Sequence, residues 1–130
     1  MSDFRINKIR EALKKAGISE TFYNESEKVV CFDNYMYFSF ADSQKIVYNA
    51  ICMEVPDNKK TMLTVFCRMI NETYKNVDFA VTEELLMAYT AISNSIFMRD
   101  DNESELLFAL GDIIDETKSG TKHMYQLMNK

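Results

Sequence analysis

The sequence predicts a single α+β domain spanning residues 1–130. Its hydrophobic period changes from helical to strand-like, back to helical, to strand-like again and finally to helical, an order typical of antiparallel strands packed with separate helices. A chain of 130 residues can bury enough apolar surface for one core. The single proline and three glycines leave no stretch with the composition of a linker.

The first predicted element is an amphipathic helix from about Ser2 to Ala16. Ser2 is a suitable N-cap, and Gly17 can take the left-handed conformation that ends a helix. The apolar residues fall on one arc of roughly 120° of the helical circumference. They are Ile6, Ile9, Ala12, Leu13 and Ala16. We therefore expect this helix to lie on one apolar surface.

Three strands follow, at Val29–Asp33, Tyr35–Phe40 and Lys45–Val55. Each is rich in β-branched and aromatic residues, and short turn-forming sequences separate them. Short connections join antiparallel neighbours, so these segments predict a three-stranded antiparallel meander.

The second of these strands has one apolar face and one tyrosine face. The apolar side chains are those of Met36, Phe38 and Phe40. Tyr35 and Tyr37 alternate with them, and Tyr48 of the third strand can join the two tyrosines. If helices cover only the apolar face, Tyr35, Tyr37 and Tyr48 form a surface open to a protein or peptide partner. The alternative is that a terminal segment of the same chain covers them.

A second helix follows Pro56 and runs to about Lys75, with Asp57 or Asn58 as its N-cap. Its apolar residues span roughly 200° of the circumference, about twice the arc that one packed surface needs. They are Met62, Leu63, Val65, Phe66, Cys67, Met69, Ile70 and Tyr74. Either the helix is enclosed within its own chain, or a second subunit covers part of it. In the second case the chain forms a homodimer, with an interface that contains Met62, Val65, Phe66 and Met69.

The rest of the chain predicts a two-stranded hairpin and a long C-terminal helix. The hairpin strands are Val77–Thr82 and Leu85–Ile92. Asn102 with Glu105 resembles a capping box, which opens a helix that reaches about Met128. Together these elements complete an α+β layout of helix, meander, helix, hairpin and helix.

The residues predict no catalytic or metal site. His123, the single histidine, falls on the polar side of the last helix, so no base stands beside a nucleophile. Cys31, Cys52 and Cys67 lack the spacing of a zinc or redox motif and are expected to be small buried residues. The acids from Asp100 to Glu105 lack the ligand pattern of a calcium loop. We expect no enzymatic activity, no metal and no cofactor.

The charge and hydropathy of the chain limit its partners. A net charge of −5 argues against a nucleic-acid partner, because Lys and Arg supply most of the affinity for phosphates; a basic protein segment is a better match. No apolar run approaches the roughly 18 residues of a membrane span, and the first residues lack a signal-peptide pattern. We therefore expect a cytoplasmic protein with no membrane partner.

The layout resembles the type III secretion chaperone-like fold, and within it the YbjN-like family. Three segments carry the resemblance: Ile9–Ile18, Val29–Phe40 and Met69–Val81, the last with a helix that passes near Asn71 through a short loop into a strand. The resemblance implies a small, acidic, non-enzymatic protein that commonly dimerises. Secretion chaperones of this fold hold an extended effector segment along their surface, and YbjN-like proteins are regulators or chaperone-like adaptors.

The predicted function is therefore that of a protein- or peptide-binding module, chaperone-like or regulatory, which acts as a homodimer on an unidentified partner. The alternative is a small-ligand-binding domain with a pocket between the sheet and the helices. The side chains expected to line that pocket are Met36, Phe38, Phe40 and Tyr89.

Overall fold

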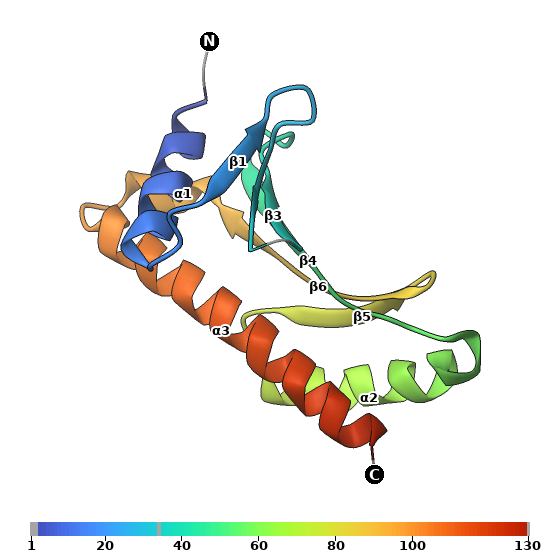
Figure 1. Ribbon diagram of the computed structural model, residues 1–130. Coiled ribbons are helices and arrows are strands. Elements are labelled where there is room, and N and C mark those ends of the chain that lie inside the picture. The colour runs from blue at the N-terminus through green and yellow to red at the C-terminus, as the bar shows by residue number, and fades with distance from the viewer. Residues whose placement is uncertain (1–2, 34, 130) are drawn as a thin grey trace. The chain divides into compact units, whose positions relative to one another are not determined.

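The computed structural model describes residues 3–33 and 35–129, and its elements follow the α+β order expected from the sequence (Figure 1). The helices are α1 (Phe4–Lys15), α2 (Lys60–Thr73) and α3 (Asn102–Met128), with short 3₁₀ helices η1 (Asp57–Lys59) and η2 (Asn94–Met98). The strands are β1 (Thr21–Asn24), β2 (Val29–Phe32), β3 (Met36–Ser39), β4 (Lys45–Glu54), β5 (Asp78–Thr82) and β6 (Leu85–Ser93). They hydrogen-bond in the order β1-β2-β3-β4-β6-β5.

Residue contacts divide the described chain into two compact units. Unit 1 contains the described residues up to Tyr48 together with Ala91–Asp112, and unit 2 contains Asn49–Thr90 and the described residues from Ile113 onward. Strands β4 and β6 and helix α3 each contribute to both units. The expectation of a single domain stays a prediction.

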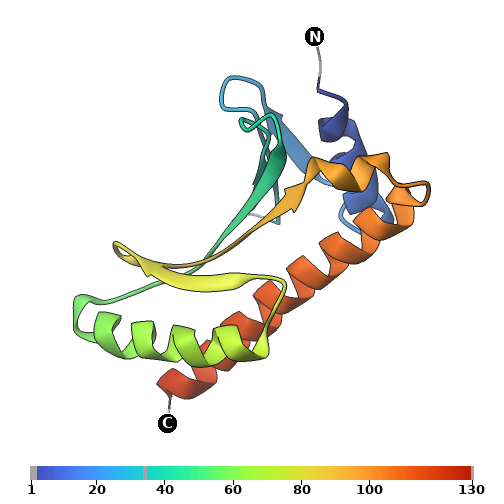
Figure 2. The ribbon, with the colours of Figure 1, turned by 180° about the vertical axis from the view of Figure 1, so that it is seen from behind.

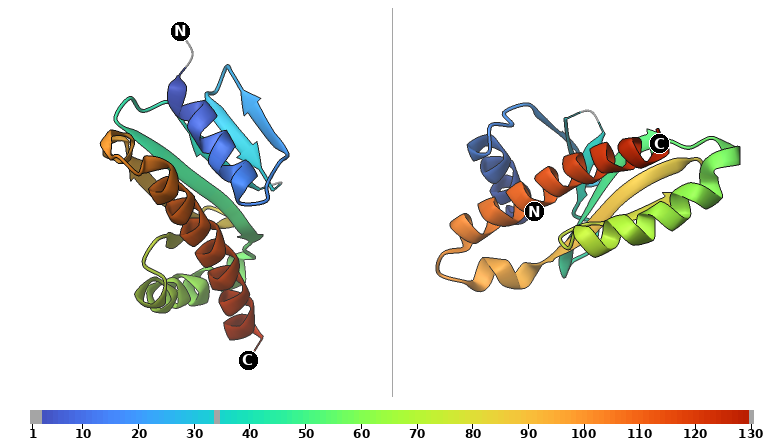
Figure 3. Two further views of the ribbon diagram at one scale, coloured as in Figure 1. Left: turned by 90° about the vertical axis from the view of Figure 1, so that its left-hand side faces the viewer. Right: turned by 90° about the horizontal axis from the view of Figure 1, so that it is seen from below.

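In unit 1, α1 lies along one face of the first strands (Figure 3, left). Its N-cap is Asp3, whose carboxylate accepts a hydrogen bond of 3.0 Å from the backbone N–H of Arg5. The N-cap expected at Ser2 lies outside the described residues. Gly17 has the left-handed φ of 93° predicted for the end of this helix, and the N–H of Ile18 donates to the Leu13 carbonyl.

The meander has one more strand than the sequence analysis predicts. β1 pairs antiparallel with β2, and β2 pairs antiparallel with β3. β1 is only four residues long, and its alternation is too short to give a clear period of two. The additional strand leaves the α+β fold class unchanged.

In unit 2, α2 follows the η1 turn, and it has no side-chain cap from Asp57 or Asn58, contrary to the prediction. Its buried residues are Leu63, Cys67 and Ile70, and it packs on β5 (Figures 1 and 2). Near its C-terminus the Asn71 side chain accepts from the N–H of Phe79 at 2.7 Å and donates to the Phe79 carbonyl at 3.0 Å. This two-bond contact fixes the passage from α2 into β5.

Helix α3 spans the predicted residues, but it does not begin with a capping box. The Asn102 amide donates to the carbonyls of Phe97 and Arg99, and Glu105 forms an ion pair with Arg99. The C-terminal half of α3 lies on the same side of β5 as α2 (Figure 3, right), and Gly120 faces the Phe79 ring. No described helix has the length and hydropathy needed to cross a membrane.

Candidate functional site

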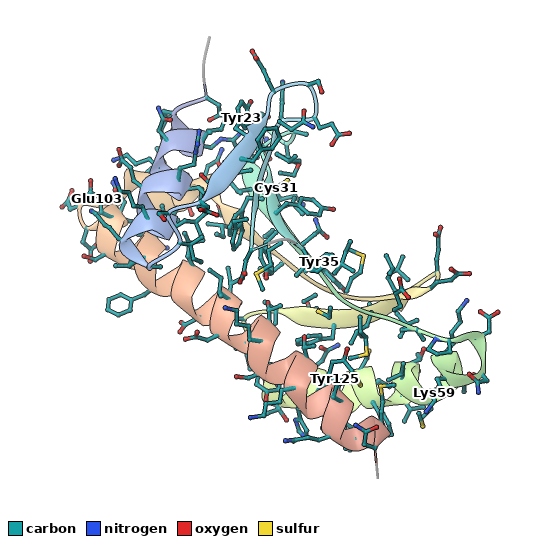
Figure 4. All side chains as sticks on the ribbon, viewed as in Figure 1. Tyr23, Cys31, Tyr35, Lys59, Glu103 and Tyr125 are labelled. Atoms are coloured by element: carbon teal, nitrogen blue, oxygen red, sulfur yellow. The ribbon has the colours of Figure 1, made fainter. Side chains whose placement is uncertain are left out.

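The outer face of the meander carries a row of half-exposed and exposed side chains from three strands. Phe22 of β1 lies opposite Cys31 of β2, and Cys31 lies opposite Tyr37 of β3. Phe22 is 66% exposed and Tyr35, just before β3, is 64% exposed, whereas Cys31 and Tyr37 are half-buried. Figure 4 labels Cys31 and Tyr35 on the side of the strands away from α1. We call Phe22, Cys31, Tyr35 and Tyr37 the aromatic face.

The alternation of the strands explains why these side chains point to solvent. Residues that alternate with the aromatic face are buried: Val30, Phe32 and Phe38. The Phe32 and Phe38 rings stack with centroids 5.5 Å apart. Because this inner side forms the core of unit 1, the opposite side of the same strands is left uncovered by α1.

Tyr48 is not part of this surface, contrary to the prediction. Its side chain is fully buried, and its ring lies 5.2 Å from the Phe38 ring, on the core side. The buried residues Ile46 and Ala50 have the same parity along β4 as Tyr48, so the strand alternation turns all three inward. The polar tip of tyrosine suggested an outward position, but the parity with Ile46 was the better signal.

Phe22 is the surface residue that sequence reasoning missed. Its strand was overlooked, although Thr21-Phe22-Tyr23 is β-prone and precedes the turn-forming sequence that starts at Asn24. Its register with Cys31 places Phe22 on the aromatic face from β1, at the opposite edge of the meander from β4, where Tyr48 was expected.

A groove of about 620 Å³ continues from the aromatic face in unit 1. Ile18, Phe22 and Cys31 contribute apolar walls, and the exposed acids Glu20 and Asp33 lie on its boundary. A groove that combines apolar walls with polar groups at its boundary is suited to binding a ligand or a partner segment.

The apolar arc of α2 is only partly covered in unit 2. Val65 is 51% exposed and Met69 is 50% exposed, while Met62 and Phe66 are half-buried. Residues at spacings of three and four lie side by side on a helix, so these four form one stripe along α2. The buried residues Leu63, Cys67 and Ile70 form a second row along α2. The wide apolar arc predicted for this helix therefore consists of one row in the core and one row that is partly exposed to solvent.

In unit 2, Cys52, Cys67 and His123 have surroundings that are typical of structural residues. Burial raises the pKa values of the Cys52 and Cys67 thiols, which disfavours the nucleophilic thiolate. The His123 ring packs edge-on against Tyr74, with centroids 6.3 Å apart. Among residues 3–33 and 35–129, no group of three or more His, Cys, Asp or Glu side chains could hold a metal ion.

The side chains predicted to line the alternative pocket differ in their burial. Phe38 and Phe40 are buried in unit 1, and Phe38 contacts the Phe32 and Tyr48 rings. Tyr89 is 43% exposed on β6, and so it does not line an interior cavity. The ligand pocket between the sheet and the helices stays a prediction.

Comparison with solved structures identifies the fold. YbjN from E. coli superposes with a TM-score of 0.71 at 12% identity, covering 95% of this chain and 93% of that one. A chain of the HopA1–SchA chaperone–effector complex gives a TM-score of 0.61 at 9% identity, covering 92% and 94%. A chain of the heterodimeric ExoU–SpcU complex from the type III secretion system of Pseudomonas aeruginosa gives 0.58 at 15% identity, covering 92% and 96%.

These identities are low, and so the superpositions establish the fold alone. No protein-family model matches the sequence, and the search of curated proteins gives no match. The resemblance inferred from the order of the elements is confirmed at the level of structure. The chain has the α+β fold that is shared by YbjN and the type III secretion chaperones.

Proposed function

We propose that this protein is a non-enzymatic, chaperone-like module that holds an extended segment of a partner protein on its aromatic face. The observation that carries the proposal is the row Phe22, Cys31 and Tyr37, with Tyr35 beside it, on the side of the meander away from α1. Aromatic side chains supply large contact areas at a small entropic cost, and they dominate the binding energy of many interfaces.

The geometry of the aromatic face favours an extended segment. Adjacent strands lie about 4.8 Å apart, so Phe22, Cys31 and Tyr37 form a row roughly 10 Å long across the strands. A partner in an extended conformation presents side chains on alternate sides and can place one set on this row while the other set faces water. The groove beside Ile18 and Phe22 gives the segment a path beyond the row.

The compared structures support the same class of function. One is named as a chaperone–effector complex and another as a heterodimeric complex of a secretion system. A fold that accommodates protein partners in those cases suits a protein-binding role here. We extend to this chain a cytoplasmic location and a chaperone-like or regulatory role.

Removing the aromatic face is expected to abolish partner binding while leaving the fold intact. In the variant Phe22→Ser/Tyr35→Ser/Tyr37→Ser, retention of the partner should fall at least about tenfold, because interface aromatics are frequent hot spots. The melting temperature should change little, since Phe22 and Tyr35 are mostly exposed. Quantitative mass spectrometry of affinity-purified protein from the source cells measures the first effect, and thermal unfolding measures the second.

A matched control removes three exposed apolar side chains elsewhere, in the variant Met98→Ser/Phe108→Ser/Tyr125→Ser. A partner specific for the aromatic face is retained by this control and lost by the first variant. A partner retained by both, or lost equally from both, contradicts the proposed binding surface.

We further propose that the protein is a homodimer that buries the stripe Met62, Val65, Phe66 and Met69 of α2. The exposure of Val65 and Met69 by about half supports this assignment, because their side of α2 is only partly covered in unit 2. The spacing of the four residues matches two turns of a helix–helix seam. A two-fold axis would bring the same stripe of a second chain against the first.

Charging the stripe is expected to convert the dimer into a monomer. Light scattering at micromolar concentration should give about 30 kDa for the unmodified protein, twice the chain mass of 15.2 kDa. The variant Val65→Asp/Met69→Asp should give the chain mass, because the interface would have to bury two unpaired carboxylates. The control Lys60→Gln/Thr64→Asp changes the net charge by the same amount on the polar side of α2, away from the stripe, and should remain dimeric. A monomeric unmodified protein would remove the dimer from the proposal and leave the binding module.

A further inference from the structure

The hairpin of unit 2 has a second uncovered sheet face. The register pairs Asp78 with Tyr89, Ala80 with Met87 and Thr82 with Leu85, so these six side chains share one face. Of the alternating residues, Phe79, Leu86 and Ala88 are buried and Val81 is half-buried. Figure 2 shows α2 on one side of the hairpin only.

The centre of this face is apolar. Leu85, Met87 and Tyr89 follow one another along β6, with Ala80 of β5 beside them. Tyr89 is 43% exposed, and the other three are half-buried. Alternate residues of a strand lie about 7 Å apart, so this row is about 14 Å long. We call Leu85, Met87, Tyr89 and Ala80 the hairpin face.

Both ends of the hairpin face are acidic. Glu83 and Glu84 form the turn, and Glu54 at the end of β4 lies with them on a groove of about 580 Å³ that Leu85 also lines. At the other end, Asp78 is exposed and lies opposite Tyr89. Within the part of the chain that the structure describes, none of these four carboxylates forms an ion pair.

No cation of the same segments neutralises these carboxylates. The sequence contains no Lys or Arg between Lys45 and Lys59, and none between Lys75 and Arg99. Unit 2 therefore combines an apolar row with two acidic ends on one face. A negative surface of this kind repels phosphate groups and attracts basic side chains.

We propose that the hairpin face docks a basic, extended segment of a partner protein, with apolar side chains at alternate positions and Lys or Arg on both flanks. Three alternate apolar side chains match the length of the Leu85–Tyr89 row. The flanking cations then lie near the acids of the turn at one end and near Asp78 at the other. The hairpin face belongs to unit 2 and shares no residue with the aromatic face of unit 1, and the proposal does not depend on the function assigned there.

A fluorescein-labelled peptide of sequence Lys-Arg-Val-Ser-Val-Ser-Tyr-Arg-Lys tests the proposal by fluorescence polarisation with the full chain. Binding should weaken at least tenfold when Glu replaces every Lys and Arg, and at least fivefold when Ser replaces Val and Tyr. Binding should also weaken as salt is raised, because charges near the surface are screened. Equal binding of the Ser-substituted peptide overturns the proposal, since simple charge attraction would then account for the affinity.

Variants of the chain locate the binding surface. Glu54→Gln/Glu83→Gln/Glu84→Gln and, separately, Met87→Ser/Tyr89→Ser should each weaken binding of the basic peptide at least fivefold. The control Glu72→Gln/Asp112→Asn/Asp115→Asn removes the same charge from exposed positions on α2 and α3 and should change the affinity less than twofold.

Two outcomes with these variants contradict the proposal. An equal loss in the control would mean that net charge, and not the hairpin face, attracts the peptide. If peptide binding is absent and the Met87→Ser/Tyr89→Ser variant abolishes self-association of the chain, then a second copy occupies the face. Circular dichroism of each variant verifies that the fold is retained.

Discussion

Replacing Gly120 by alanine is expected to lower the free energy of unfolding by about 2–3 kcal/mol, the usual cost of overpacking a core. A Cβ atom at this position would lie 2.3 Å from Cζ and 2.6 Å from Cε2 of the Phe79 ring. Phe79 is 2% exposed and its ring packs edge-on against the Tyr74 ring, with centroids 6.4 Å apart, so it has little room to move. Either α3 or the ring must shift, and both are part of the core of unit 2.

Gly111 provides a matched control on the same helix. Nothing lies within 4 Å of a Cβ added there, so Gly111→Ala should raise stability by about 0.5–1 kcal/mol through helix propensity alone. Urea unfolding of the two variants measures the difference in sign. Adding Phe79→Leu to the Gly120→Ala variant should recover part of the loss. A stabilising Gly120→Ala substitution would contradict the contact between α3 and β5.

The contrast between the two glycines illustrates what a sequence can and cannot predict. Helix propensity treats Gly111 and Gly120 alike, as sites that weaken a helix by about 1 kcal/mol each. The role of Gly120 depends on Phe79, which lies 41 positions earlier in the chain (120 − 79). Such a long-range contact leaves no local pattern in the sequence.

Local signals predicted the fold well where they were strong. Gly17 follows the last turn of α1, and α3 reaches Met128, as predicted. Both ends could be predicted because the apolar residues keep their helical spacing up to each end and lose it afterwards. The capping box at Asn102 was wrong, since its side-chain amide donates to carbonyls of the preceding turn. Strand β1 was missed because four residues are too few to establish a period.

Two patterns in the sequence predict part of the candidate surfaces: the alternation of side chains along a strand and the width of the apolar arc of a helix. Tyr35 is exposed and Tyr37 half-buried on the outer side of the meander, whereas Tyr48 is in the core. Phe22 could be found only with β1. Along α2 the excess apolar arc indicated Val65 and Met69, and both are half-exposed. The excess apolar arc indicates that this side of α2 is suited to a contact, but it carries no signal of which surface makes that contact.

A buried arginine in unit 1 was not expected from the sequence: helix periodicity places Arg5 within the arc of the apolar stripe, four residues before Ile9, but it indicates no partner for the charge. Arg5 is 5% exposed, and its guanidinium makes an ion pair of 2.5 Å with Asp3. It also donates to the carbonyls of Phe40 and Asp42, at 3.1 and 3.0 Å, and to the Asn94 side chain at 3.1 Å. One side chain therefore joins the start of α1 to the end of β3, the turn before β4 and the η2 segment.

Arg5→Met is expected to lower the free energy of unfolding by about 2–4 kcal/mol, because it leaves several acceptors in unit 1 without their donor. Arg5→Lys should recover only part of the loss, since an ammonium cannot reproduce the planar fork of the guanidinium. Arg10→Met is the control: Arg10 is exposed and donates to the Thr21 hydroxyl at 2.9 Å, so its loss should cost less than about 1 kcal/mol. Equal effects of Arg5→Met and Arg10→Met in urea unfolding would contradict this account.

The Asp3–Arg5 pair also predicts how stability changes with pH. Hydrogen bonds from the Arg5 side chain hold the pKa of the Asp3 carboxyl below its ordinary value of 3.8. A group whose pKa is lower in the folded state binds protons more weakly there than in the unfolded chain, so its stabilisation is complete above about pH 4 and is lost as pH falls through the folded-state pKa. The variant Asp3→Asn should therefore be less stable than the unmodified protein at neutral pH, and the difference should shrink below pH 4. Urea unfolding at pH 7 and pH 3 measures both.

An equal difference in the free energy of unfolding at both pH values would contradict this prediction. The ionised Asp3 carboxylate would then not be what stabilises the start of α1. The contacts of Arg5 with the Phe40 and Asp42 carbonyls would account for the effect of Arg5→Met.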